Sequence, residues 1–131
     1  MEHGIFDIAH HPSFLLIKLT GSFNQEGSLA FTTAIKVAIA ELESLPFALL
    51  FDITEFEGAT PDAYEEVEAL NIWLNAQQLI AKATVIKSRV QIAIANFLSP
   101  ARKQQNTQHF YHYSDAQIWL TQELANHASL T

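Results

Sequence analysis

The segment 47–53, with the sequence FALLFDI, limits the possible folds more than any other part of the chain. Apolar residues occupy six of its seven positions. A strand alternates its side chains between two faces, so neither face of a strand formed here could lie against water. The segment is also too short for a typical buried helix. We therefore expect a central strand in a sheet that is covered by helices.

Segments with strand and helix periodicity alternate along the rest of the chain. The turn residues of HHPS, at 10–13, predict a hairpin between the first two strands. The expected strands, besides 47–53, are 5–9, 14–20, 81–87 and 108–113. The expected helices are 28–44, which Pro46 should end, 61–74, 89–98 and a last helix capped by Ser114 or Asp115. The predicted fold class is α/β, with a mixed sheet of about five strands covered by helices in the order β-β-α-β-α-β-α-β-α, in a single domain of residues 1–131.

Residues 88–98 allow more than one structure. Ser88 and Gln91 have the spacing of a capping box, which favours the helix 89–98. The sequence VQIAIA, at 90–95, also alternates with the period of a strand, and a third alternative extends the preceding helix into the 80s. We favour the helix, and Pro100 is expected to end the element in each case.

The composition excludes several kinds of function. The chain has no cysteine, which excludes disulfides, thiol catalysis and cysteine-bound metals. The net charge of −7 disfavours nonspecific binding to nucleic acid. No apolar run approaches the roughly 18 residues needed to span a bilayer, and the N-terminal residues lack the pattern of a signal peptide. We therefore expect a cytoplasmic protein that has no membrane span and does not bind nucleic acid.

No pattern of residues indicates catalysis. The chain has no phosphate-binding glycine loop and no nucleophile elbow. His109 and His112 would point to opposite faces of a strand, so they could not bind one metal ion together. We expect no enzymatic activity, no cofactor and no metal.

Acidic and basic residues are segregated along the chain. Seven acidic residues and no basic one lie between Asp52 and Glu68. The segment from Lys82 to Lys103 holds five of the seven basic residues and no acidic one. One interpretation is that two solvated faces attract each other. The other is a polar docking surface for a basic partner.

Thr60, Pro61 and Asp62 have the features of a helix start. Thr60 suits the N-cap, Pro61 the first helical position, and Asp62 the positive end of the helix dipole. A loop expected at 54–60 precedes them, at the carboxyl end of the central strand, where α/β proteins often place functional residues. The candidate contacts for a protein partner are therefore Glu55, Glu57, Thr60 and Asp62.

Three short motifs, in this order, resemble those of the STAS family, whose best-known members are bacterial anti-sigma-factor antagonists. LTGSFN (19–24) resembles the first strand and its "G-x-L-D" end, LLFDIT (49–54) resembles the central "L-D-L-S" strand, and SDAQIWL (114–120) resembles the closing "D-x-x-x-A-L" helix. The chain is most similar to a SpoIIAA-like branch of small bacterial proteins with unknown roles, in which "TPE" or "TPD" opens the second helix. The resemblance covers most of the chain and implies a non-enzymatic regulatory or protein-interaction domain.

In STAS antagonists, a partner kinase phosphorylates a serine of a "D-S-S-G" motif at this helix start and thereby switches partner binding. The four positions correspond here to Thr60, Pro61, Asp62 and Ala63. The phosphorylated serine then corresponds to Asp62, or to Pro61 if the loop shifts by one, and neither can accept a phosphate. The resemblance implies a domain without an obvious phosphorylatable serine. Our hypothesis is that Asp62 supplies a permanent charge instead.

The alternative function is a carrier or sensor of a small apolar ligand such as a lipid, because some proteins of this branch are grouped with lipid-carrying folds. The residues expected to line an apolar pocket between helix and sheet are Phe31, Tyr64 and Trp73. A candidate anion site for a ligand, a lipid head group or a partner consists of Lys87, Ser88 and Arg89, at the start of a helix. The identity of a protein partner and association with a second copy of the chain stay open.

Overall fold

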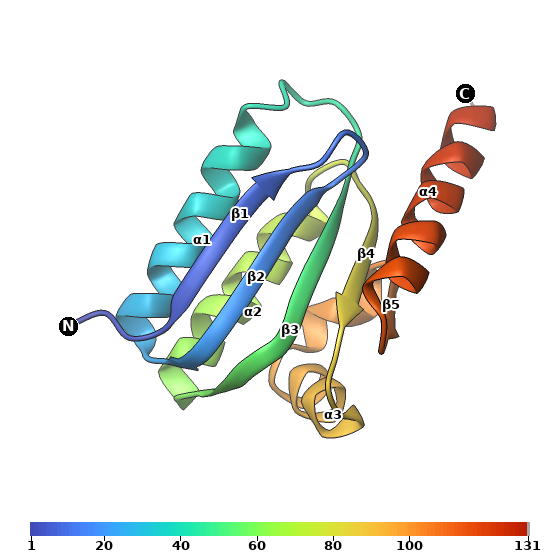
Figure 1. The fold of residues 1–131 in the computed structure, drawn as a ribbon. Coiled ribbons are helices and arrows are strands. Elements are labelled where there is room, and N and C mark those ends of the chain that lie inside the picture. Colours follow the sequence, from blue (N-terminus) through green and yellow to red (C-terminus); the bar gives the residue numbers. More distant parts are fainter. Residues whose placement is uncertain (131) are drawn as a thin grey trace.

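The computed structural model describes residues 1–130 and contains one five-stranded sheet with the strand order β1-β2-β3-β4-β5 (Figure 1). The strands are β1 (Ile5–His10), β2 (Leu15–Phe23), β3 (Phe47–Ala59), β4 (Leu79–Val85) and β5 (Thr107–Phe110). The helices are α1 (Gln25–Ala40), α2 (Pro61–Asn75), α3 (Arg89–Leu98), the short 3-10 helix η1 (Pro100–Gln104) and α4 (Tyr113–Ser129). β1 is antiparallel to β2, and all other neighbouring strands are parallel. This mixed sheet and the order of its elements confirm the predicted fold class.

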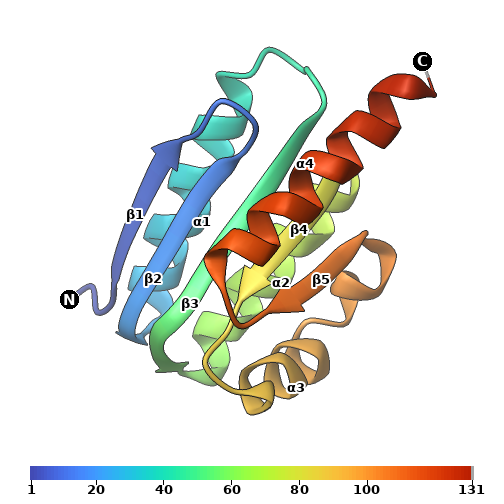
Figure 2. The ribbon, with the colours of Figure 1, turned by 45° about the vertical axis from the view of Figure 1, so that its right-hand side comes forward.

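The helices form a layer on each face of the sheet. α1 and α2 lie side by side against one face, and α4 lies against the other (Figures 1 and 2). Leu49 belongs to the core under α1 and α2, and its neighbour Leu50 belongs to the core under α4. Both side chains are fully buried. The alternation of a strand therefore explains why 47–53 is apolar at almost every position, and it confirms that this segment is a central strand.

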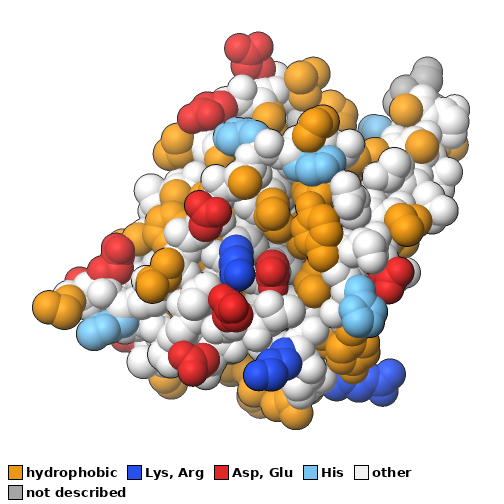
Figure 3. All heavy atoms as spheres, viewed as in Figure 1, with side chains coloured by type: hydrophobic (Ala, Val, Ile, Leu, Met, Phe, Trp, Pro, Cys, Tyr) orange, Lys and Arg blue, Asp and Glu red, His pale blue; other side chains and the backbone are white. Residues whose placement is uncertain are grey.

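One half of the sheet face opposite α1 and α2 is polar. α4 packs on β3, β4 and β5, which leaves β1 and β2 uncovered on this side (Figure 2). Lys18 of β2 lies in register with Asp7 of β1 and Asp52 of β3, and its Nζ is 3.3 Å from Oε2 of Glu55. Figure 3 shows a Lys or Arg side chain among acidic ones near the middle of this face.

β3 continues six residues beyond the predicted strand, to Ala59. The prediction of a loop at 54–60 is therefore wrong, because residues 54–59 belong to β3 and only Thr60 lies outside it. β2 likewise continues past the predicted end at residue 20, and its last residues pair with the end of β3. Gly21 (φ 83°) and Gly58 (φ 124°) adopt left-handed backbone conformations beside register shifts in this pairing. Glycine here permits an irregular strand pair, whereas the sequence pattern suggested that it ends the strand.

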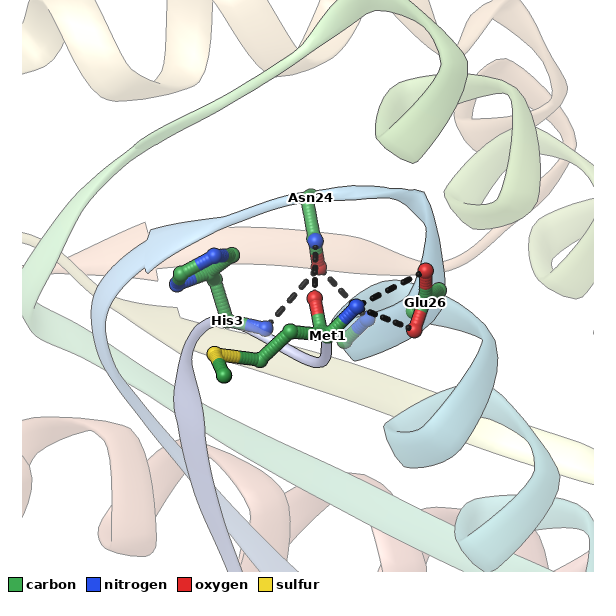
Figure 4. A network of polar contacts seen from close by, with 5 residues as sticks. Met1, His3, Asn24 and Glu26 are labelled. Carbon is green, nitrogen blue, oxygen red and sulfur yellow. Dashed lines mark hydrogen bonds and ion pairs between the residues drawn. The ribbon is translucent and has the colours of Figure 1, made fainter.

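α1 begins at Gln25, three residues before the predicted start, because Asn24 caps it. The Asn24 Oδ1 accepts hydrogen bonds from the backbone N–H groups of Gly27 (2.9 Å) and His3 (3.0 Å), and its Nδ2 donates to the carbonyl oxygen of Met1 (2.6 Å) (Figure 4). The N-terminal amine lies 3.1 Å from Oε2 of Glu26. A Cβ on Gly27 would lie 1.8 Å from the His3 carbonyl oxygen, so this close approach of the N-terminal residues requires glycine.

The end of α1 also differs from the prediction. The helix ends at Ala40, and residues 41–44 form a turn in which Glu43 (φ 54°) and Ser44 (φ 65°) are left-handed. Pro46 therefore does not end the helix. Left-handed residues interrupt the helical ladder earlier and direct the chain back toward β3.

The remaining boundaries follow the sequence unevenly. α2 begins at Pro61 with Thr60 as its N-cap, and α3 begins at Arg89 with the predicted capping box of Ser88 and Gln91, so both predictions are confirmed. The strand predicted at 108–113 ends at Phe110. α4 has His112 at its N-cap position and no side-chain cap, so neither Ser114 nor Asp115 caps it. Among residues 1–130, no helix is long and apolar enough to cross a membrane.

Candidate functional site

A cavity of about 90 Å³ lies between the sheet and the helices at the carboxyl ends of β3 and β4. Phe51, Ile53 and Phe56 of β3 contribute to its apolar wall on the sheet side. On the helix side, Leu70 of α2 and Ile92 of α3 contribute to the opposite wall. The carboxyl ends of parallel strands are where open α/β sheets bind ligands, so the place and the lining make this cavity the candidate functional site.

Lys82 of β4 is the most unusual residue of the cavity. Lys82 is only 3% exposed, and its Nζ donates a 3.0 Å hydrogen bond to Oδ1 of Asn71 on α2. The same Nζ lies 5.6 Å from the centre of the Phe51 ring. Burial lowers the pKa of Lys82 well below its usual 10.5, and the positive charge of Arg102 lowers it further. Among residues 1–130 the amine therefore has one hydrogen-bond acceptor and no counter-ion, although a lysine can donate three hydrogen bonds.

A second basic residue, Arg102 of η1, lines the same cavity. Its Nε donates to Oδ1 of Asn96 at 3.0 Å, and burial lowers the pKa of its guanidinium. Arginine nevertheless keeps its proton at neutral pH. No acidic residue lines the cavity. The ion pairs within residues 1–130 join Met1 to Glu26 and Lys18 to Glu55, all outside the cavity. Two basic side chains thus share an apolar cavity that no acidic residue within 1–130 lines.

A chain of hydrogen bonds holds Lys82 from behind. The Asn71 Oδ1 also accepts from Nε2 of Gln105 (3.0 Å), and its Nδ2 donates to Oγ of Ser99 (2.7 Å). The Ser99 hydroxyl in turn donates to Oε1 of Glu68 (2.7 Å). Asn71 and Ser99 are buried, so each of these bonds satisfies a group that water cannot reach. The network fixes the amide orientation of Asn71 and therefore the position of the Lys82 amine.

Two hydroxyl groups in the cavity lining have no hydrogen-bond partner in the described part of the chain, residues 1–130. Ser28 of α1 and Thr84 of β4 both line the cavity, and their hydroxyl oxygens are buried. A buried hydroxyl without a partner is unfavourable, so a polar group in the cavity would stabilise the protein here. These hydroxyls and the two cations define the polar atoms available to a bound molecule.

The three predicted pocket residues do not line one common pocket. Phe31 and Tyr64 line the cavity, and burial raises the pKa of the Tyr64 hydroxyl from its usual 10.0. Trp73 instead lines a different hollow of about 440 Å³, near the start of β3 and the end of α2. This hollow is the larger of the two, but no charged side chain lines it. Lys36 lies over the Trp73 ring, 5.5 Å from its centre.

The predicted acidic contacts lie at the far end of β3 and the start of α2. Glu55, Glu57, Thr60 and Asp62 are all exposed. Thr60 uses its hydroxyl within the helix start, because it accepts from the backbone N–H of Ala63 and donates to Oδ1 of Asp62. Glu55 pairs with Lys18, so part of this acidic surface is neutralised within the molecule.

The predicted anion site lies at the exposed start of α3. The amides there are already used: Gln91 Oε1 accepts from the backbone N–H groups of Lys87 and Ser88, and the Ser88 hydroxyl accepts from that of Val90. Lys87 and Arg89 are exposed, and neither forms an ion pair among residues 1–130.

Sequence reasoning did not identify Lys82, Asn71 or Arg102 as site residues. Two features of the sequence nevertheless indicated Lys82 and Asn71. Lys82 lies between Ala81 and Ala83 in a predicted strand, and Asn71 lies in the apolar stripe of helix 61–74. A polar residue at a position that should be buried indicates a specific hydrogen-bond partner.

Comparison with family models and with curated proteins finds no match for this chain. Comparison with solved structures finds an uncharacterised protein of the DUF3478 family with a SpoIIAA-like fold, from Shewanella loihica PV-4. The two chains share 21% sequence identity with a TM-score of 0.67, over 92% of this chain and 95% of the other. The chain therefore has a SpoIIAA-like fold, which confirms at the level of the fold the resemblance inferred from the motifs.

Proposed function

We propose that the protein is a non-enzymatic binding domain whose cavity accepts a small apolar ligand with an anionic group, such as a short-chain carboxylate. The observation that carries the proposal is the pairing of Lys82 and Arg102 in an apolar cavity without an acidic residue. Burying a cation without a partner is unfavourable, and an anion would offset this cost. The free hydroxyls of Ser28 and Thr84 would complete the polar contacts of such a group.

The size of the cavity favours a small ligand. Ligand sites for drug-sized molecules are usually about 300–1,000 Å³, and an engineered cavity of about 150 Å³ holds benzene. A cavity of about 90 Å³ suits a ligand with a few carbon atoms. This supports a sensor of a small molecule over a carrier that encloses a whole lipid.

The proposal predicts that butyrate binds in the cavity and n-butanol binds at least tenfold more weakly. A hydrogen bond to a charged group contributes about 1.5–3 kcal/mol, which is roughly tenfold or more in affinity. The measurement is a titration followed by the amide and methyl NMR signals of residues such as Ile92 and Thr84. Bound anion favours the protonated amine, so the affinity should fall as the pH rises through the pKa of Lys82 in the free protein.

Two variants separate the cavity from the surface. Lys82→Met and Arg102→Gln should each weaken butyrate binding at least tenfold. Lys87→Gln with Arg89→Gln is the matched control, since it removes two exposed cations and should leave binding unchanged. Equal binding of butyrate and n-butanol, or equal binding by the Lys82→Met variant, would refute the anion site.

The exposed acids favour a second function, a regulatory domain that binds a basic protein partner through Glu55, Glu57, Thr60 and Asp62. All four are exposed around the start of α2. The resemblance to STAS antagonists, which bind partners at this helix start, supports the proposal. In this proposal Asp62 supplies the constant charge that a phosphoserine supplies in those proteins. Recognition would then be mainly electrostatic and weakened by salt.

The second function predicts that a partner is lost when the acidic surface is neutralised. The triple variant Glu55→Gln, Glu57→Gln, Asp62→Asn should capture that partner from its host cells at least tenfold less efficiently. The control, Glu2→Gln with Glu41→Gln and Glu43→Gln, has the same net charge and changes exposed acids elsewhere. The partner must also bind the purified protein directly. Equal loss in both variants would point to net charge alone and reject this surface.

A further inference from the structure

We propose that the outer face of α3 docks the protein onto the surface of an anionic lipid bilayer, with apolar side chains in the interface and basic side chains against the lipid phosphates. This inference concerns the exterior of α3 and does not rest on the ligand proposed for the cavity. It is carried by two features of the same short segment, an exposed apolar stripe and a basic border.

The stripe consists of large apolar side chains on the solvent side of α3. Val90, Ile94 and Phe97 are 62%, 40% and 85% exposed, and Leu98 beside them is 37% exposed. Positions separated by three and four residues fall on one side of a helix, so Val90, Ile94 and Phe97 form the stripe, and Leu98 lies at its edge. Ile92 is the one buried residue of α3, and it faces the cavity. The helix is therefore amphipathic in an unusual sense, since its most apolar face is turned outward.

Basic residues border this stripe at both ends of the helix. Lys87 and Arg89 lie at the start of α3, and Lys103 follows it in η1. All three are exposed and none forms an ion pair among residues 1–130. Figure 3 shows Lys or Arg side chains beside hydrophobic ones at the lower edge of the molecule, where Figure 1 places α3.

The distribution of charge favours an anionic bilayer as the occupant. The segment from Lys82 to Lys103 contains no acidic residue, although the whole chain has a net charge of −7. Close to an anionic bilayer, the exposed basic residues at α3 would be attracted and the acidic remainder of the molecule repelled, so α3 would face the membrane. A second copy related by a twofold axis would instead place the same basic residues close to one another across the contact. An apolar stripe with a basic border is also the pattern of helices that lie in the plane of a membrane surface.

Docking in this way would place the cavity close to the membrane. Gln91, Ile92 and Ala95 line the cavity from the inner face of α3, while the stripe occupies its outer face. The helix is thus the wall between the cavity and the proposed bilayer.

The test is co-sedimentation of the purified full chain with large unilamellar vesicles. Vesicles of phosphatidylcholine with 30% phosphatidylglycerol should bind the protein at least tenfold more tightly than phosphatidylcholine alone. Raising the salt from about 50 mM to about 500 mM should remove most of this preference, because it screens the basic border. Phe97→Gln should weaken binding to the anionic vesicles at least fivefold, and Lys87→Gln with Arg89→Gln and Lys103→Gln at least tenfold.

A control changes another exposed apolar residue, on a different helix. Ile118 of α4 is 57% exposed, so Ile118→Gln should leave vesicle binding unchanged. All the substituted side chains are exposed, and circular dichroism would verify that each variant is folded. Absence of binding to anionic vesicles, or a Phe97→Gln variant that binds like the wild type, would overturn the proposal. Light scattering that shows a dimer of the wild type, but a monomer of Phe97→Gln, would assign the stripe to a second copy and would also overturn it.

Discussion

Lys82→Met is expected to make the protein more stable at neutral pH. The reason is that burial lowers the pKa of Lys82 well below 10.5, so the folded protein holds the protonated amine at a cost in free energy that methionine removes. Methionine fills a similar volume without a charge. After the substitution, Oδ1 of Asn71 keeps Nε2 of Gln105 as a donor. Urea unfolding of the two proteins measures the difference.

The pH dependence of the free energy of unfolding tests independently whether burial of the Lys82 charge destabilises the protein. Between the folded pKa of Lys82 and about 10.5, the unfolded chain binds more protons at this residue than the folded protein does. The wild type should therefore gain stability as the pH rises through this window, and the advantage of the Lys82→Met variant should shrink. Lys87→Met, at an exposed position, is the control and should show no such trend. A constant difference between wild type and Lys82→Met across the window would mean that Lys82 is not buried as a costly cation.

Asn71→Leu is expected to destabilise the protein by about 3 kcal/mol. Leucine is similar in size but offers no polar atom. The substitution leaves the Lys82 amine and the Gln105 amide without their acceptor, and it removes a donor to Ser99. Each buried polar group left unsatisfied costs about 1–3 kcal/mol. Denaturant unfolding at constant pH measures the loss.

Two further variants test whether the loss comes from the network. Asn75→Leu removes a single hydrogen bond, from its Nδ2 to the carbonyl oxygen of Ala101, and should cost about 1 kcal/mol. The double variant Asn71→Leu with Lys82→Met should recover part of the loss, since no amine is then buried without a partner. Strict additivity of the two single substitutions would show that Asn71 does not act through Lys82.

The sequence was sufficient for the order of the elements because their signals are local. The doubly apolar segment 47–53 required two helical layers, and the spacing of Ser88 and Gln91 selected a helix over a strand. Boundaries of elements that depend on contacts between distant segments could not be predicted from local sequence patterns. The second strand was predicted to end at residue 20, yet Gly21 and Gly58 permit an irregular pairing between β2 and β3 that only the three-dimensional structure reveals.

The candidate site was harder to predict for a related reason. Phe31 and Tyr64 were identified as aromatic residues of two helices that were expected to pack against the sheet. Trp73 has the same character, but it lies at the other end of the sheet. Lys82 and Arg102 belong to the basic segment 82–103, but only these two of its basic residues line the cavity. The other three, Lys87, Arg89 and Lys103, face solvent. The charge of the segment does not indicate which of them point inward. Direction along a strand depends on register, which the sequence specifies only through its partners.

The uncovered part of the sheet has a consequence for how this protein behaves at high concentration. A bare sheet surface next to an unpaired outer strand is a common starting point for ordered aggregation between molecules. Here the surface carries Lys18 in register with Asp7 and Asp52, and Lys18 forms an ion pair with Glu55 within the molecule. Stacking against another molecule would remove water from these charges, so they oppose such association.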